Sequence, residues 1–255
     1  MAEYQMTLMD RQRIARDTMA FWLDTNGTDY QFRAGQHADF TFLHPSREHE
    51  GDNSRTFSLA NSPQDRGQVM IALRMRETGF KTAMKGAALG TKFQVSRARG
   101  SFTLHKETTR AAVFLAGGIG ITPMRSILNW AAQERLERKL YLFYSNRRLE
   151  DVAFLKELED LAVQNPYFEF IPTLTRVDSP AWPHEKGHID REMLSRYLVG
   201  LKGPVYYIAG PSGMVTAMTE LLHSSGVGDD DMKTEEFGDY KVIENSVQTN
   251  QISKG

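Results

Sequence analysis

The chain has 255 residues, which is more than one average domain, and it balances 31 basic against 32 acidic residues. A net charge of −1 gives no reason to expect nucleic acid or a membrane surface as partner. The absence of cysteine excludes disulfides, thiolate zinc sites and cysteine-held iron–sulfur clusters, so any redox chemistry needs another carrier.

The N-terminal segment has charges throughout, and no run of about 18 apolar residues occurs anywhere in the chain. We therefore predict a cytoplasmic protein. Three histidines, His37, His44 and His49, lie in one region, but their separations fit no zinc spacing and no cysteine assists them. The sequence predicts no metal site.

The first 105 residues consist of short alternating apolar runs separated by turn-forming segments. The predicted strands are residues 4–10, 18–24, 37–43, 55–60, 68–76 and 92–97. Only the Ala-rich stretch 79–89 has helical spacing. This pattern is typical of an antiparallel β-barrel or sandwich.

After residue 110 strands and helices alternate. The predicted strands are residues 111–116, 139–145, 167–174 and 204–210, and the predicted helices are 123–138, 151–165, 190–198 and 211–226. Alternation of this kind favours a parallel sheet with helices on both faces, here expected to have five strands. The sequence therefore predicts two domains, residues 1–108 and 109–255.

The stretch AGGIGITP, residues 116–123, joins the first predicted parallel strand to its helix. Gly117, Gly118 and Gly120 let a ligand approach the backbone, while Thr122 is expected to cap the helix and Pro123 to occupy its first position. Free amides at a helix start favour an anion, most commonly a diphosphate. The alternative is a tight strand-to-helix turn without a ligand.

The spacing G-G-x-G-x-x-P resembles the nucleotide loop of the ferredoxin-NADP reductase superfamily. Four further motifs resemble that family in its order: RTFS at 55–58, ETGFKTAMKG at 77–86, FYSNRR at 143–148, and YYIAGPSGM at 206–214. The resemblance implies an FAD-binding antiparallel barrel followed by an NAD(P)-binding α/β domain.

The resemblance implies flavin contacts in the first half of the chain. The positions are Arg55, Thr56, Phe57, Ser58, Leu73, Arg74, Gly79, Lys81 and Thr82. Arg55 would supply charge to the diphosphate, Phe57 would pack on the isoalloxazine in place of the usual Tyr, and Ser58 would act near flavin N5. Read without the resemblance, the motif is an ordinary strand with Phe57 in the core.

The resemblance also implies nucleotide contacts in the second half. They are Gly117, Gly118, Gly120, Thr122, Pro123, Ser145, Asn146, Arg147, Gly210, Pro211 and Met214. Thr122 would help to place the nicotinamide, and the arginines after Asn146 slightly favour NADPH over NADH. Ala209 stands where many members have Cys. Near the C-terminus Glu235 is a candidate proton relay, and either Phe237 or Tyr240 would cover the flavin.

The implied function is an FAD-dependent NAD(P)H oxidoreductase that passes electrons to a separate acceptor, with ferredoxin or flavodoxin as the expected partner. Residues 66–110 contain ten basic and two acidic residues, a net charge of +8 that could steer an acidic partner. A solubilising surface explains this charge equally well. The alternatives are a reductase of free flavin or quinone, and a non-catalytic nucleotide-binding subunit.

Overall fold

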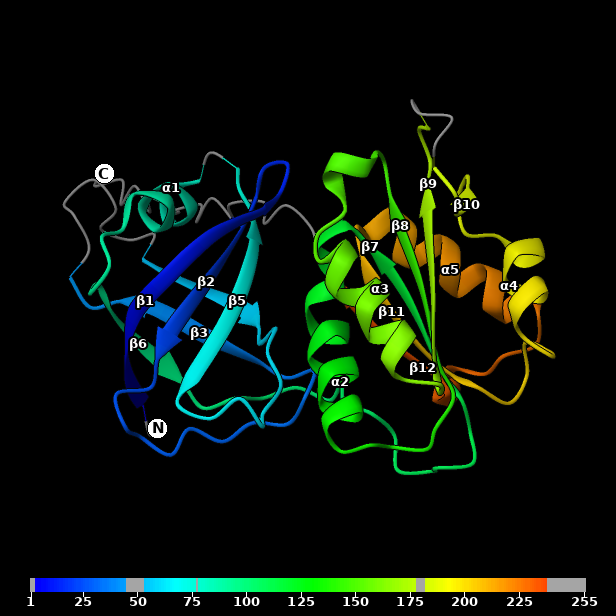
Figure 1. Cartoon of the computed structure of the whole chain (residues 1–255), viewed down its shortest axis with the longest axis horizontal. Helices are drawn as coiled ribbons and strands as arrows, with labels where there is room; N and C mark the ends of the chain where they lie inside the picture. Colours follow the sequence, from blue (N-terminus) through cyan, green and yellow to red (C-terminus); the bar gives the residue numbers. More distant parts are fainter. Residues whose placement is uncertain (1–2, 45–52, 77, 178–181, 238–255) are drawn as a thin grey trace, which may run out of the picture.

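The computed structural model describes residues 3–44, 53–76, 78–177 and 182–237, which form two sheets lying side by side (Figure 1). The N-terminal sheet has six strands in the order β4-β3-β6-β1-β2-β5. The C-terminal sheet has six strands in the order β10-β9-β8-β7-β11-β12. No helix in the described ranges is long and apolar enough to cross a membrane.

Every pairing in the N-terminal sheet is antiparallel, as predicted. Its strands are β1 Glu3–Ala15, β2 Thr18–Asp24, β3 His37–Phe42, β4 Ser54–Ser58, β5 Gln68–Arg74 and β6 Lys92–Ser96. The edge strands β4 and β5 approach each other, and the Ala60 N–H donates to the Met70 carbonyl at 2.8 Å just beyond β4. The sheet therefore curls toward the barrel shape that the pattern predicts.

Among the described residues of this half the single α-helix is α1, Gly79–Gly86. Phe80 and Met84 lie one turn apart and are fully buried in the core of the antiparallel sheet, which gives the helix its apolar face. Its N-cap is Thr78, whose hydroxyl accepts the Lys81 N–H at 3.4 Å.

All pairings in the C-terminal sheet are parallel. Its strands are β7 Ala112–Gly117, β8 Leu140–Asn146, β9 Phe168–Leu174, β10 Glu185–Lys186, β11 Val205–Gly210 and β12 Met232–Glu236. The expectation of five strands was wrong. The two-residue strand β10 has no apolar run that would predict it. It forms through its pairing with Thr173 and Leu174.

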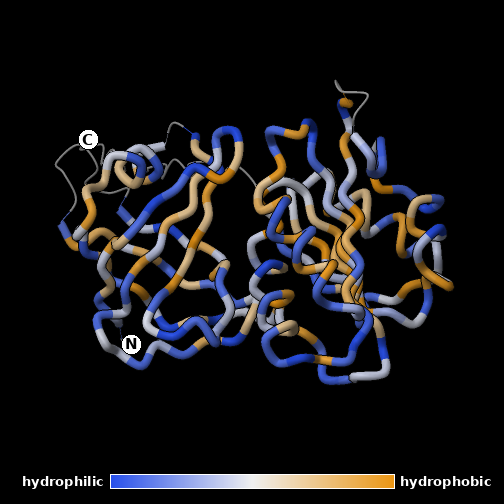
Figure 2. Tube along the Cα trace, in the orientation of Figure 1, coloured by the Kyte–Doolittle hydropathy of each residue, from blue (hydrophilic) through white to orange (hydrophobic). Residues whose placement is uncertain are grey.

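Helices cover both faces of the parallel sheet (Figure 1). They are α2 Ile121–Gln133 and α3 Leu155–Gln164 on one face and α4 Arg191–Tyr197 and α5 Ser212–Ser224 on the other. Short 3₁₀ helices are η2 Gly118–Gly120, η3 Leu149–Asp151 and η4 Asp229–Asp231. Because both faces are covered, β7 and β11 are buried along their whole length, and Figure 2 shows the apolar strands inside.

The two-part organisation predicted from the change of period is thus present, an antiparallel half followed by a parallel α/β half. The predicted domain boundary at residues 108 and 109 falls between β6 and β7 and stays a prediction.

Candidate active site

The glycine loop, residues 117–120, runs from the end of β7 into α2. A Cβ on Gly120 would collide with the backbone of Ala209 and Gly210, and one on Gly117 would reach the Met214 sulfur and lie 3.0 Å from the Pro211 ring. Gly118 differs, because its φ is +53° and no atom lies within 4 Å of a Cβ built there. Two glycines therefore allow close packing, and the third faces open space.

Two predictions about this loop were wrong. The helix begins at Ile121 after a Gly120 N-cap, so Pro123 occupies its third position, where a missing N–H is equally harmless. Thr122 is not the cap. Its side chain is 1 % exposed and its hydroxyl donates to the Ile119 carbonyl at 3.0 Å, so it shapes the loop instead of presenting a free hydroxyl to a ligand.

The second loop of this edge, Gly210–Met214, lies directly against the glycine loop. Strand β12 brings the C-terminal segment to the same place, since Glu235 pairs with Ala209 and the Phe237 N–H donates to the Gly210 carbonyl at 2.8 Å. The carboxyl ends of β7, β11 and β12 therefore gather most of the nucleotide residues predicted from sequence, at the edge where open α/β sheets bind ligands. Tyr240 lies outside the described residues.

The flavin motif forms β4, whose side chains alternate between two faces. The rings of Phe57 and Phe80 are 5.5 Å apart, so the partly exposed Phe57 is supported from below by α1. Thr56 donates its hydroxyl to the Asp39 carboxylate, which occupies that hydroxyl within the protein. Ser58 is buried and pairs across the sheet with His37.

The remaining predicted flavin residues lie around the start of α1. Leu73 is buried in the core of the antiparallel sheet, which leaves only its backbone near a ligand, whereas Arg74 at the end of β5 is partly exposed. Thr82 follows the first turn of α1, and its N–H bonds to the Thr78 carbonyl. Its amide is therefore already used within the helix.

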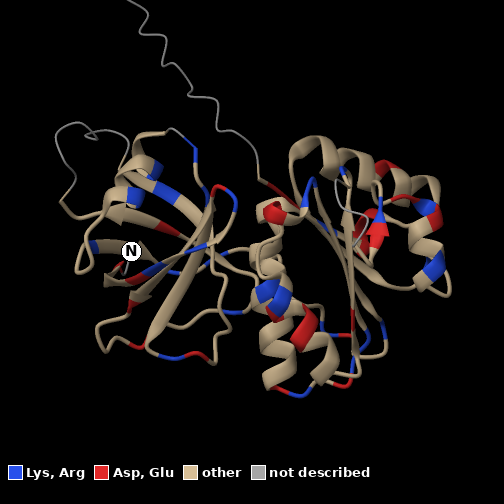
Figure 3. Cartoon of the chain, turned by 45° about the horizontal axis from the view of Figure 1, so that its top comes forward, with Lys and Arg blue, Asp and Glu red and all other residues tan. Residues whose placement is uncertain are grey.

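Basic side chains gather at this helix start, and α1 carries basic segments in Figure 3. Burial lowers the pKa of Lys81, and the nearby charges of Arg76, Arg55 and Arg74 lower it further. An anion bound here would relieve that repulsion, and the amide of Gly79 lies at the positive end of the helix. The donor set therefore fits a diphosphate.

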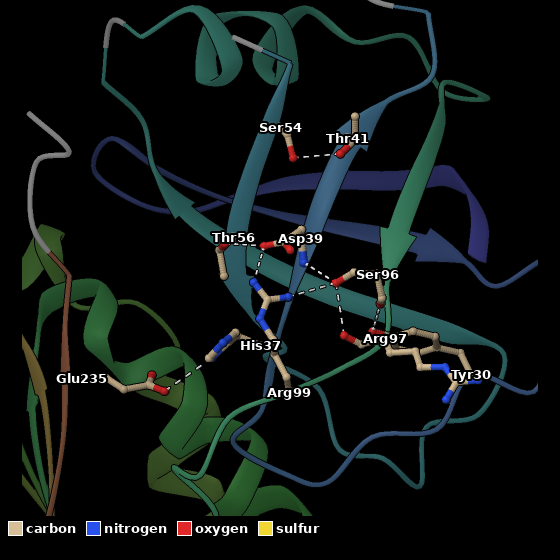
Figure 4. A network of polar contacts seen from close by, with 10 residues as sticks. All are labelled: Tyr30, His37, Asp39, Thr41, Ser54, Thr56, Ser96, Arg97, Arg99 and Glu235. Atoms are coloured by element: carbon tan, nitrogen blue, oxygen red, sulfur yellow. Dashed lines mark hydrogen bonds and ion pairs between the residues drawn. The ribbon is translucent and has the colours of Figure 1, made fainter. Parts of the chain in front are cut away.

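The two sheets meet between these features. Ile119 of the glycine loop packs in one apolar cluster with Ala60, Met70 and Ala72 of the antiparallel half. His37 and Glu235 approach each other from opposite halves, with 3.7 Å between Nδ1 and Oε1 (Figure 4). The flavin-motif strand and the glycine loop are therefore close neighbours.

A polar network extends from His37 along the outside of the antiparallel sheet (Figure 4). The Arg99 guanidinium donates to the Asp39 carboxylate at 2.7 Å and holds the pKa of that carboxyl below its usual value. The Asp39 N–H donates to the Ser96 hydroxyl at 2.9 Å. These bonds fix the strand that carries His37.

The predicted ribose segment ends β8, where Ser145 is partly exposed, Asn146 is buried and Arg147 is exposed. Its backbone is tied to the end of β9, because the Arg176 N–H donates to the Arg147 carbonyl at 2.8 Å. Beside it lies a pocket of about 400 Å³. Its lining includes Arg148, Glu150, Glu159, Arg176, Trp182 and His184.

Sequence reasoning missed several residues of this region. Arg176 and Trp182 belong to a stretch that was interpreted as a surface loop, and His37 was considered only as a metal ligand. Arg125 also escaped notice, because an arginine inside an amphipathic helix pattern is usually a solvated side chain. Only its position one turn after the glycine loop could have drawn attention to it.

Comparisons with known proteins agree with this geometry. Residues 114–220 match the family model described as an oxidoreductase NAD-binding domain. The structure resembles a ferredoxin NADP⁺ reductase from Neisseria gonorrhoeae solved with FAD and NADP, with a TM-score of 0.77, 18 % identity, and coverage of 92 % of this chain and 98 % of that one. The family model thus covers much of the second half of the chain, and the whole chain shares the fold of this reductase.

A second structure with this fold is the FAD/NAD-binding domain of a Vibrio cholerae nitric oxide dioxygenase. Its TM-score is 0.78 at 18 % identity, over 92 % of this chain and 98 % of that one. At such identities the structures establish the shared fold. The predicted FAD and nicotinamide nucleotide agree with the descriptions of the family model and of both structures.

The curated relatives that the chain matches are longer than it is. The phenol hydroxylase P5 protein of Acinetobacter pittii is 26 % identical over 92 % of this chain and 65 % of its own length. One component of the Na⁺-translocating NADH-quinone reductase of Klebsiella pneumoniae is 29 % identical over 72 % of this chain and 49 % of its own. The chain thus spans about half to two thirds of these relatives.

Proposed function

We propose that this chain is an FAD-dependent NAD(P)H oxidoreductase that passes electrons from NAD(P)H through FAD to a separate acceptor. One observation carries the proposal: Ile119 of the glycine loop packs in one apolar cluster with Ala60, two residues beyond the flavin-motif strand β4, and with Met70 of β5. In this proposal residues 1–108 form the flavin domain and residues 109–255 the nucleotide domain.

FAD, when bound, supplies a ring that accepts a hydride from the reduced nicotinamide and gives up electrons to an acceptor. The basic cluster of Arg55, Arg74 and Lys81 would hold its diphosphate, and Phe57 would pack on the ring. Ser58 and the His37–Glu235 pair would hold protons at the junction of the two halves. Their partial burial also limits the access of water to that junction.

The glycine loop would hold the nucleotide diphosphate by its backbone amides. At the far end of the sheet, Arg148 and Arg176 line the pocket beside Trp182, which favours the additional phosphate of NADPH. Glu150 and Glu159 line the same pocket and oppose that preference, so both nucleotides belong in the test.

The proposed acceptor is a ferredoxin or flavodoxin, attracted by the +8 segment 66–110. A protein acceptor is supported by the name of another relative, the reductase component of a Pseudomonas phenol 2-monooxygenase, which is 26 % identical over 73 % of this chain. A cytoplasmic location, where reduced nicotinamide nucleotides are produced, is part of this proposal.

The proposal has two alternatives, a different class of acceptor and a protein without turnover. Free flavin or quinone is a second class of acceptor. A non-catalytic nucleotide-binding subunit is suggested by Ala209 and Phe57. They stand where members of the ferredoxin-NADP reductase superfamily, which the sequence resembles, usually have Cys and Tyr.

The test is an anaerobic titration of the purified protein with NADH and with NADPH while the flavin absorbance is recorded. The proposal expects a yellow protein that is bleached by at least one nucleotide and recovers its absorbance when ferredoxin or flavodoxin is added. Recovery only with quinone or free flavin would favour the second acceptor class. A colourless protein that oxidises neither nucleotide, even with added FAD, would refute the oxidoreductase proposal.

A further inference from the structure

Two consecutive side chains of α2 hold two consecutive carbonyls of the segment that follows the flavin motif. Arg125 Nη1 donates to the Ala60 carbonyl at 2.6 Å, and the Ser126 hydroxyl donates to the Asn61 carbonyl at 2.6 Å. Ser126 is fully buried and the Arg125 side chain is only 13 % exposed. Hydrogen bonds to a charged donor in such a dry place are stronger than average.

The orientation of Arg125 is fixed by α3. Its Nε and Nη2 donate to Glu157 Oε2 at 3.1 and 3.0 Å, and the guanidinium lies 4.7 Å from the centre of the Phe154 ring. Asn129 donates to the other oxygen of Glu157 at 2.9 Å. Glu157 and the Phe154 ring therefore fix the guanidinium, and its remaining amino group, Nη1, points at Ala60.

Phe154 also has an unusual backbone. Its φ is +61°, in the left-handed region that bulky residues rarely adopt, so the surrounding structure must compensate for the strain. Its ring packs against the apolar clusters of both sheets, including Ala60 and Met70 of the antiparallel half. The aromatic ring thus fills the junction beneath Arg125.

The bond between Arg125 and Ala60 joins two segments that lie next to the two predicted cofactor motifs. Ala60 follows Ser58 by two residues, and Arg125 follows the glycine loop by five. A bond between Arg125 and Ala60 therefore ties the end of the flavin motif to the helix whose start would receive the nucleotide.

We propose that Arg125 is a positioning residue that sets the separation between the flavin-motif strand and the glycine loop. The inference rests on the proposed function, because that separation is the gap across which a hydride would pass from nicotinamide to flavin. Hydride transfer needs contact distance, and a misplacement of about 1 Å can lower a rate roughly 100-fold. A lysine at this position could not make both contacts at once, since a single ammonium group lacks the planar fork that reaches Glu157 and Ala60 together.

The test compares Arg125→Met, Arg125→Lys and a control, Arg16→Met, by anaerobic stopped-flow measurement of flavin reduction at saturating nucleotide. Arg16 also joins the two halves, through Glu150 at 2.9 Å and Asp151 at 2.8 Å; it contacts neither β4 nor the glycine loop, and its partner Glu150 lines the pocket beside β8. We expect R125M to reduce its flavin about 10- to 100-fold more slowly, R125K to be intermediate, and R16M to match the parent. FAD content and the KM for the nucleotide should stay within about 3-fold of the parent.

An unchanged rate in R125M, or an equal loss in R16M, would overturn the inference. Should R125M fail to fold, R125K and Ser126→Ala are measured in the same way; Ser126→Ala keeps Arg125 and removes the hydroxyl that donates to the Asn61 carbonyl and accepts the Gly35 N–H. Rates equal to the parent's in both R125K and Ser126→Ala would also overturn the inference.

A second readout separates this inference from the proposed function. The chain has no cysteine, so labels can be attached at exposed positions by Lys92→Cys and Glu220→Cys, one in each half. The distance distribution between spin labels should broaden in R125M and not in R16M. An unchanged distribution overturns the inference whatever the activity, whereas a broadened one in a chain that oxidises neither nucleotide overturns only the oxidoreductase proposal.

Discussion

The glycine loop offers a pair of substitutions that separate packing from ligand binding. Gly120→Ala would place a methyl group against the backbone of Ala209 and Gly210, which cannot rotate away. Overpacking of a core costs about 1–3 kcal/mol, and a clash with backbone belongs at the upper end, about 3 kcal/mol. For a protein of this size each kcal/mol lowers the Tm by about 2–4 °C, so we expect a loss of roughly 6–12 °C.

Gly118→Ala is the matched variant, since its methyl group meets no atom within 4 Å. Only the left-handed φ of +53° is penalised, at a cost of about 1 kcal/mol or a Tm loss of about 2–4 °C. If the loop holds a nucleotide diphosphate, the methyl group lies where that ligand must approach, and the Kd for NADPH or NADH should rise at least about 10-fold.

Calorimetric melting measures the first effect, and isothermal titration with each nucleotide measures the second. A G118A variant that binds both nucleotides as the parent does would refute the assignment of this loop to the nucleotide. A G120A variant that melts within about 2 °C of the parent would show that the contact with Ala209 is easily relaxed.

Three further predictions concern single side chains. Lys81→Met should weaken FAD binding about 10-fold by removing charge from the basic cluster at α1, measured by release of flavin fluorescence on dilution, whereas Lys81→Arg should keep most of the affinity. Glu235→Gln should lower turnover with ferricyanide about 10-fold at unchanged FAD content; equal turnover would remove it from the proton path. Burial and nearby Arg138 lower the pKa of His105, so the unfolded chain binds the proton more readily and the free energy of unfolding should fall as pH drops below about 6.5. Denaturant titrations between pH 7.5 and 5 should show a shallower fall in His105→Gln; equal slopes would contradict this.

The fold could be predicted largely from local patterns. Residues 37–42 alternate polar and apolar side chains, residues 18–24 and 68–76 are short apolar runs, and the helix at Ile121–Gln133 shows a 3.6-residue period. Each of these elements can therefore be predicted from its own sequence. The glycine loop was equally visible, because its composition and its place after a buried strand are local features. The family resemblance then placed both halves in order.

Other parts of the structure depend on partners far along the chain. The bond from Arg125 to Ala60 joins residues 65 apart, and the pair of His37 and Glu235 joins the two sheets. No local pattern encodes such a meeting. Thr122 shows the opposite limit. Thr before Pro is a common capping pattern, but the structure starts the helix two residues earlier, at Ile121, directly after the 3₁₀ turn at Gly118–Gly120.

The junction between the halves explains why α2 is the element that matters for alignment. Its start is the end of the glycine loop, and its second turn bonds to the chain just after β4, so the two cofactor walls are connected through one short rigid helix. The covalent link from β6 to β7 is much longer, and a long connection alone would leave the separation of the walls poorly defined. Because the helix path is short and its donors are buried, a displacement of the loop moves the flavin-motif strand with it. In the proposed reductase, the alignment of the site would therefore depend on Arg125 and Ser126, which lie outside both β4 and the glycine loop.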